Sequence, residues 1–153
     1  MPSLDHKIPP PLIALACVIA AWLLARAVPG VAFVWPSRVP IAVLCIAAGV
    51  LLALSGIVTF RKARTTLDPH APDRATSMVR TGPYRFTRNP MYLGLATALL
   101  GICIYFANPL TLVALIFFIG YITRYQIVPE ERALLAKFGE PYARYLRSVR
   151  RWI

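Results

Sequence analysis

Two polar segments contain most of the residue types in this chain that could do chemistry. The first, residues 80–92, runs through a Gly-Pro turn into an apolar stretch, and the second begins with the pair Glu130 and Glu131. Backbone N–H groups at a helix start suit a carboxylate, and a glutamate suits an ammonium or another cation. Tyr84 and Tyr92 could stack on an aromatic ring or face a cation. Together these features suit a zwitterion, although a phospholipid headgroup would satisfy much of the same requirement.

The elements that must position these residues are long and apolar. The chain has 153 residues, 58% of them hydrophobic, and a mean hydropathy of +0.62, which is too apolar for a soluble domain of this size. Four apolar stretches account for the excess, three of them long enough to cross about 30 Å of hydrocarbon. They are residues 11–28, 41–60, 91–106 and 110–128. We therefore expect an all-α polytopic membrane protein, one membrane domain over 1–153 with four transmembrane helices. An alternative for the first stretch is a cleaved signal peptide; its length and the preceding prolines favour a retained helix.

The charge distribution predicts the orientation of these helices. The net charge is +11, and seven of the 17 basic residues lie in 61–88 while seven more lie from 124 onward. By the positive-inside rule the loop 61–90 and both termini face the cytoplasm, as expected for a bacterial inner membrane. This clustering beside apolar stretches favours the lipid bilayer as the partner of the charges and argues against nucleic acid.

The sequence offers little for a metal site or a coupled transporter. The three cysteines lie within the apolar stretches, and the two histidines are isolated, so we expect neither a metal site nor a disulfide framework. The apolar stretches contain no Asp, Glu or Lys. A small four-helix transporter would need an ionisable residue there to couple ion and substrate, which makes that class the weaker alternative.

The segment after the fourth stretch changes to amphipathic helices. Residues 130–138 predict one short helix that Gly139 ends, and Pro141 begins a second that extends from Tyr142 to about Arg150. This 129–153 region is either a basic surface on the lipid or a cap folded over the 82–92 segment. We expect the cap, closing a cytoplasmic cofactor pocket.

Taken together, the two polar segments resemble the isoprenylcysteine carboxyl methyltransferase and phospholipid methyltransferase superfamily. The resemblance is in residues 82–94 (GPYRFTRNPMYLG), followed by 130–142 and by 149–152 (VRRW), in the family's order and separated by a helical hairpin. It covers roughly residues 76–152. It implies an integral membrane enzyme that uses S-adenosylmethionine, a cofactor with an amino-acid head, an adenine and a sulfonium, and that methylates a lipophilic acceptor entering from the bilayer.

The resemblance also implies a set of cofactor-binding residues. By position in the family's motifs they are Thr76, Ser77, Met78, Val79, Tyr84, Asn89, Pro90, Met91, Tyr92 and Glu130.

Two positions depart from the family's pattern. Asn89 stands where the family commonly has His, which removes any role for a titrating imidazole but keeps a capping or hydrogen-bonding role. Gln126 stands where the carboxyl-methylating branch has an Arg that holds the substrate carboxylate. Gln cannot form that bidentate pair, so Arg124 is the remaining candidate to orient an anionic acceptor. Glu131 is the candidate base for an amine acceptor; its alternative role is to complement the helix dipole.

The acceptor stays open between a prenylcysteine-like carboxylate, a phospholipid amine and a thiol. Two alternatives share the fold without the activity: a sterol-type reductase using NADPH, for which this chain is short, and a structural protein that keeps only the shell.

Overall fold

The computed structural model describes residues 7–62 and 79–153, and within these ranges all regular elements are helices. The long ones are α1 (Pro10–Ala27), α2 (Arg38–Lys62), α3 (Pro90–Phe106) and α4 (Leu112–Ile122). The chain then forms a π-helical turn, η5 (Thr123–Ile127), followed by α5 (Val128–Phe138) and α6 (Glu140–Ser148). The short 3-10 turns are η1 (Pro29–Val31), η3 (Gly82–Arg85) and η4 (Pro109–Thr111).

In the described part of the chain, three helical runs are long and apolar enough to cross a membrane. They are Pro10–Ala27, Arg38–Lys62 and Pro109–Phe138, while the apolar helix Pro90–Phe106 is shorter. Their outer faces expose large apolar side chains, among them Leu44 at 68% and Ile116 at 69%. Such faces suit a hydrocarbon solvent better than water. The all-helical class and the membrane character are confirmed.

The fourth run differs from the sequence prediction, which ended a span at Val128 and began a separate helix at Glu130. The structure instead continues one helical run from Pro109 to Phe138. No glycine interrupts the chain between Gly120 and Gly139. Pro129 has no N–H to donate to the carbonyl of Tyr125. The wider π-helical turn directly before Pro129 accommodates this missing hydrogen bond. The last helix also begins earlier than predicted, at Glu140, with Pro141 in its first turn.

Small residues bring α2 and α3 into close packing. A Cβ placed on Gly94 of α3 would lie 2.5 Å from the carbonyl oxygen of Gly49 and 2.7 Å from the backbone nitrogen of Ala53, both in α2. Only glycine allows the backbones to approach so closely. On the other side of α3, a core that includes Leu99, Phe118 and Ile122 joins it to α1 and α4.

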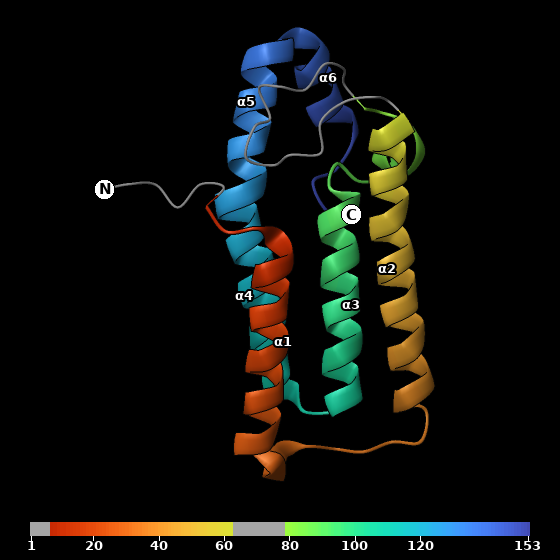
Figure 1. The fold of residues 1–153 in the computed structure, drawn as a ribbon, viewed down its shortest axis with the longest axis vertical. Coiled ribbons are helices and arrows are strands. Elements are labelled where there is room, and N and C mark those ends of the chain that lie inside the picture. Colours follow the sequence, from red (N-terminus) through yellow and green to blue (C-terminus); the bar gives the residue numbers. More distant parts are fainter. Residues whose placement is uncertain (1–6, 63–78) are drawn as a thin grey trace, which may run out of the picture.

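The two ends of the bundle are built differently. At one end the α3–α4 turn is tied to the connection after α1: the Asn108 amide donates to the carbonyl of Val28 at 2.9 Å, and the N–H of Phe33 donates to the carbonyl of Ala107 at 2.9 Å. At the other end the segment before α3, together with α5 and α6, gathers above the helices (Figure 1). Both polar segments of the sequence therefore meet at this second end.

Candidate functional site

The first part of the site is the tight turn that leads toward α3. Gly82 has φ +59, a left-handed conformation that favours glycine, and a Cβ there would lie 3.0 Å from the Thr59 hydroxyl. Pro83 then starts the 3-10 turn that buries Tyr84. The Tyr84 ring packs edge-on against Phe60, with 5.1 Å between ring centroids, and its backbone carbonyl accepts a hydrogen bond from the Tyr145 hydroxyl at 2.8 Å.

The start of α3 agrees with the predicted position but not with the predicted cap. Asn89 occupies the N-cap position and Pro90 the first turn, yet the Asn89 side chain does not bond to the helix N–H groups. Its amide donates instead to the carbonyl of Arg151 at 2.9 Å. Met91 and Tyr92 lie in the first turn, where backbone N–H groups have no acceptor within the helix. Because Asn89 does not cap them, these N–H groups can donate to an acceptor from outside the helix.

Glu130 lies where α5 passes the start of α3. The Tyr92 hydroxyl donates to Glu130 Oε1 at 2.6 Å, and Tyr92 itself is buried. Among the residues that the structure describes, no Arg or Lys pairs with Glu130. A half-buried carboxylate with one neutral donor is under-compensated, because burial removes the water that would otherwise stabilise its charge. The position suits a cation supplied from outside the protein.

Its neighbour Glu131, in contrast, has cationic partners within the chain. Arg88 donates to Glu131 Oε1 through Nη2 at 2.9 Å and through Nε at 3.2 Å. Arg151 donates to Oε2 at 2.7 Å and to Oε1 at 3.2 Å. Both carboxylate oxygens are therefore engaged by guanidinium groups.

The last five residues cross the site and bond to its other parts; we call residues 149–153 the C-terminal arm. Its carbonyls accept from the N–H of Arg88, from the Asn89 amide and from the Thr87 hydroxyl. The Trp152 indole donates to the Thr123 hydroxyl at 3.2 Å, in the π-helical turn. The arm thus joins the segment before α3 to the α4–α5 run. The sequence motif at 149–152 indicated that this region belongs to the family's pattern, but it did not indicate which residues the region contacts.

Buried tyrosines surround the carboxylate pair. Burial raises the pKa of Tyr142, and the negative charge of Glu131 raises it further. Burial also raises the pKa of Tyr145 to about 12, and burial, followed by the charges of Tyr145 and Glu130, raises the pKa of Tyr84. All three hydroxyls therefore stay protonated at physiological pH and remain hydrogen-bond donors. A hydrogen bond to Glu131 raises the pKa of Arg151.

The remaining predicted site residues are spread more widely. Arg124 is exposed on the π-helical turn, its guanidinium 5.4 Å from the centroid of the Tyr125 ring. Gln126 is fully buried, and its amide donates to the carbonyl of Ile8 at 2.8 Å, so it ties the chain before α1 to this turn. Val79 is buried. Thr76, Ser77 and Met78 lie outside the described residues.

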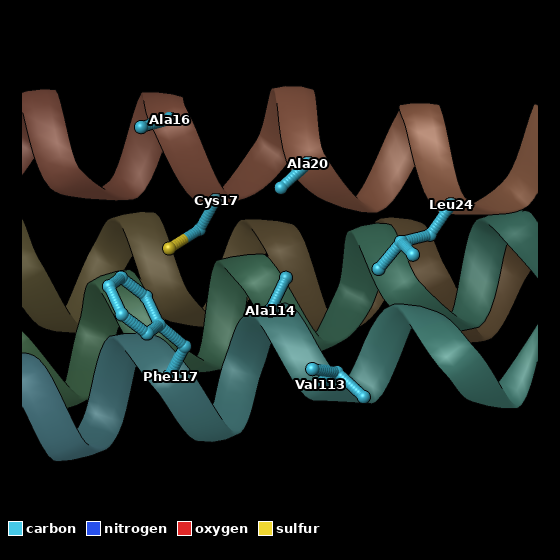
Figure 2. Close-up of a pocket in the computed structure, with 7 residues that line it drawn as sticks. All are labelled: Ala16, Cys17, Ala20, Leu24, Val113, Ala114 and Phe117. Carbon is cyan, nitrogen blue, oxygen red and sulfur yellow. The ribbon is translucent and has the colours of Figure 1, made fainter.

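A groove of about 350 Å³ lies away from the carboxylates, between α1 and α4. Figure 2 shows its lining, which is formed by Ala16, Cys17, Ala20, Leu24, Val113, Ala114 and Phe117. Apart from the Cys17 thiol, these side chains are aliphatic or aromatic. The charged and hydrogen-bonding groups lie instead at the end where the two polar segments meet.

Comparison with known proteins decides the family. The family model for phospholipid methyltransferases matches residues 37–141, more than half of the chain. The chain belongs to the phospholipid methyltransferase family. The matched residues include the Gly82 turn, the start of α3 and the carboxylate pair, whereas Tyr142, Tyr145 and the C-terminal arm lie beyond them.

A relative matches part of the same chain. It is an uncharacterized protein of Haemophilus influenzae, 43% identical over 63 residues, which make up 41% of this chain and the whole of that protein. No solved structure matches the chain. The superfamily resemblance carried by the two motifs is confirmed by the family match.

Proposed function

We propose that this family member is an S-adenosylmethionine-dependent methyltransferase acting on a lipophilic or small apolar acceptor. The observation that supports this most is the contrast between two adjacent carboxylates. Glu131 has two guanidinium partners, whereas Glu130 has, among the described residues, only the neutral Tyr92 hydroxyl. A carboxylate left without a cation in a half-buried position is a binding site for one.

The donor set fits the cofactor's amino-acid head. The ammonium would pair with Glu130, and the carboxylate would accept from the N–H groups of Met91 and Tyr92 at the start of α3, where the helix dipole favours an anion. Asn89 and Pro90 would shape this backbone. The rings of Tyr84 and Tyr92 would face the adenine or the sulfonium. Thr76, Ser77, Met78 and Val79 complete the proposed set from the segment that precedes the turn.

Bound S-adenosylmethionine would supply an activated methyl group on a sulfonium, for in-line transfer to a nucleophile. The chain's own contribution is alignment and exclusion of water. Good alignment of two reactants is worth up to about 7–11 kcal/mol. The buried Tyr142 and Tyr145, with the C-terminal arm, would cover the reacting groups, and a dry site strengthens the pairing of Glu130 with the ammonium.

The acceptor is proposed to enter from the bilayer. Arg124 is the residue best placed to orient an anionic group, because it is exposed on the membrane helix one and a half turns before Glu130. Gln126 is turned away toward Ile8. A prenylcysteine-like carboxylate, a phospholipid amine and a thiol all remain acceptors of suitable chemistry.

We propose four membrane crossings, α1, α2, α3 and the 109–128 part of the last run, within a single membrane domain whose site and termini face the cytoplasm. Single cysteines at Ser37 and Ser148, both exposed, test this in a cysteine-free background. A membrane-impermeant reagent applied to intact cells should label Ser37→Cys and leave Ser148→Cys unlabelled. Labelling of both from outside would contradict the four crossings.

The Tyr84 hydroxyl provides a test of the site that needs no acceptor. Tyr84 is 5% exposed, and its hydroxyl has no partner among the described residues. A buried hydroxyl without a partner costs about 1–3 kcal/mol. If the cofactor supplies the partner, Tyr84→Phe should raise the melting temperature of the cofactor-free protein while weakening S-adenosylmethionine binding by about threefold to tenfold, the worth of one ordinary hydrogen bond.

Tyr121→Phe is the matched control. The Tyr121 hydroxyl is also buried without a partner in the described part of the chain, but it lies in α4, beside Phe117 and Tyr125. This variant should gain stability without losing affinity. Calorimetric titration and thermal unfolding in detergent measure both quantities. An unchanged affinity in Tyr84→Phe, or a lower melting temperature, would remove this hydroxyl from the proposed site.

A further inference from the structure

The ion pairs of Glu131 connect the C-terminal arm to the segment before α3. Arg88 contributes to them from one side, and its guanidinium also donates through Nη1 to the carbonyls of Leu146, at 2.8 Å, and Val149. Arg151 contributes from the arm itself. The Arg88 and Glu131 side chains are only 10% and 12% exposed, whereas Arg151 is 37% exposed. Glu131 is thus the shared acceptor at the centre of a mostly buried network.

This network lies close in the chain to the residues proposed to hold the cofactor head. Arg88 precedes Asn89 and the first turn of α3, and Glu131 follows Glu130. The Asn89 amide, which does not cap its own helix, is held by an arm carbonyl at 2.9 Å. Displacing the arm would therefore release both the backbone at the start of α3 and the carboxylate beside it.

We propose that Glu131 is a positioning residue: it holds the C-terminal arm against Arg88 through its pair with Arg151, and so sets the geometry of Glu130 and of the α3 start. In this role it neither contacts the cofactor nor takes a proton from the acceptor. Both of its oxygens already accept hydrogen bonds from guanidinium groups. To act as a base, Glu131 would have to give up one of these ion pairs. This inference rests on the proposed function for the identity of the ligand.

Trp152 gives the arm a spectroscopic signal of its own. The chain has three tryptophans, and replacing Trp22 and Trp35 by Phe leaves only the indole that donates to Thr123. In this background Arg151→Gln should shift the emission to longer wavelength, because the arm moves toward water. Arg151→Gln keeps the Arg88–Glu131 pair and so avoids leaving a buried charge alone, which is the larger risk to folding in Glu131→Gln.

Arg151→Gln and Glu131→Gln should each weaken S-adenosylmethionine binding by about tenfold, because each removes the charge-assisted hydrogen bonds between Arg151 and Glu131 that hold the arm. The variant with both changes should bind no more weakly than whichever single variant binds more weakly, because each single change already breaks the connection between Arg151 and Glu131. Glu140→Gln is the control: it breaks the Glu140–Arg147 pair on α6, whose side chains are 66% and 67% exposed. It should change neither the emission nor the affinity.

Three results would overturn the positioning role. One is normal cofactor affinity in Arg151→Gln despite a shifted emission. Another is a double variant whose loss of affinity equals the product of the two single losses. The third is a Glu131→Gln variant that binds normally, keeps its Trp152 emission and yet has lost methyl transfer, which would make Glu131 the base. A wild-type protein that fails to bind S-adenosylmethionine would overturn the proposed function as well, whereas normal binding by Arg151→Gln would overturn the positioning role alone.

Discussion

Glu130→Gln is expected to weaken S-adenosylmethionine binding by at least about tenfold. Glutamine keeps the size of the side chain and can still accept the hydrogen bond of the Tyr92 hydroxyl, which is 2.6 Å from Glu130 Oε1. The substitution removes the negative charge and replaces one acceptor oxygen by an NH2 donor. A hydrogen bond to a charged group contributes about 1.5–3 kcal/mol, which corresponds to a tenfold or larger change in the dissociation constant.

Calorimetric titration of the two proteins in lipid nanodiscs measures this change. Glu140→Gln, the same substitution at an exposed position on α6, should bind like the wild type. The Glu130→Gln protein should unfold at a temperature no lower than that of the wild type, because burial disfavours the charged carboxylate and raises the pKa of Glu130 to about 8. A folded variant with unchanged affinity would exclude Glu130 from the site.

Gly94→Ala should destabilise the protein by about 2 kcal/mol or more, although alanine is the better helix former by about 1 kcal/mol. The added Cβ would lie 2.5 Å from the carbonyl oxygen of Gly49 and 2.7 Å from the backbone nitrogen of Ala53. These are backbone atoms of α2, and they can yield only if the helices separate. Such a separation would also displace Met91 and Tyr92 in the first turn of α3, so we expect cofactor binding to fall as well.

Gly120→Ala in α4 is the matched control, because a Cβ there has nothing within 4 Å among the described residues. It should be neutral or slightly stabilising. Thermal unfolding followed by circular dichroism compares the two variants. Equal melting temperatures for Gly94→Ala and Gly120→Ala would mean that the α2–α3 contact is looser than the structure has it.

The positions of the long helices were predictable because their apolar stretches are long and are separated by prolines and glycines. The predicted stretch 91–106 and the helix Pro90–Phe106 differ by one residue. The end of the last run was not predictable in the same way. The change to an amphipathic pattern after the fourth stretch predicted a separate helix over 130–138, whereas the π-helical turn lets one helical run continue, and no local pattern indicates such a turn.

The residues of the candidate site were predictable from the sequence, but the contacts between them were not. The spacing of Tyr92 and Glu130 in the chain says nothing of the 2.6 Å hydrogen bond between them, because it depends on how α3 packs against the last run. Asn89 was expected to cap α3 or to form another hydrogen bond; it forms the second, through its amide NH2 to an arm carbonyl, and no local pattern indicates that partner. The arm's own role depends on contacts more than 60 residues apart in the chain.

The end of the bundle where Tyr92 meets Glu130 is proposed to bind S-adenosylmethionine. Calorimetric titration of the wild-type protein in nanodiscs tests it most directly. We predict saturable binding of one cofactor per chain, displaced by S-adenosylhomocysteine and weakened in Glu130→Gln. Heat changes no larger than those of empty nanodiscs, in a protein shown to be folded, would contradict the account.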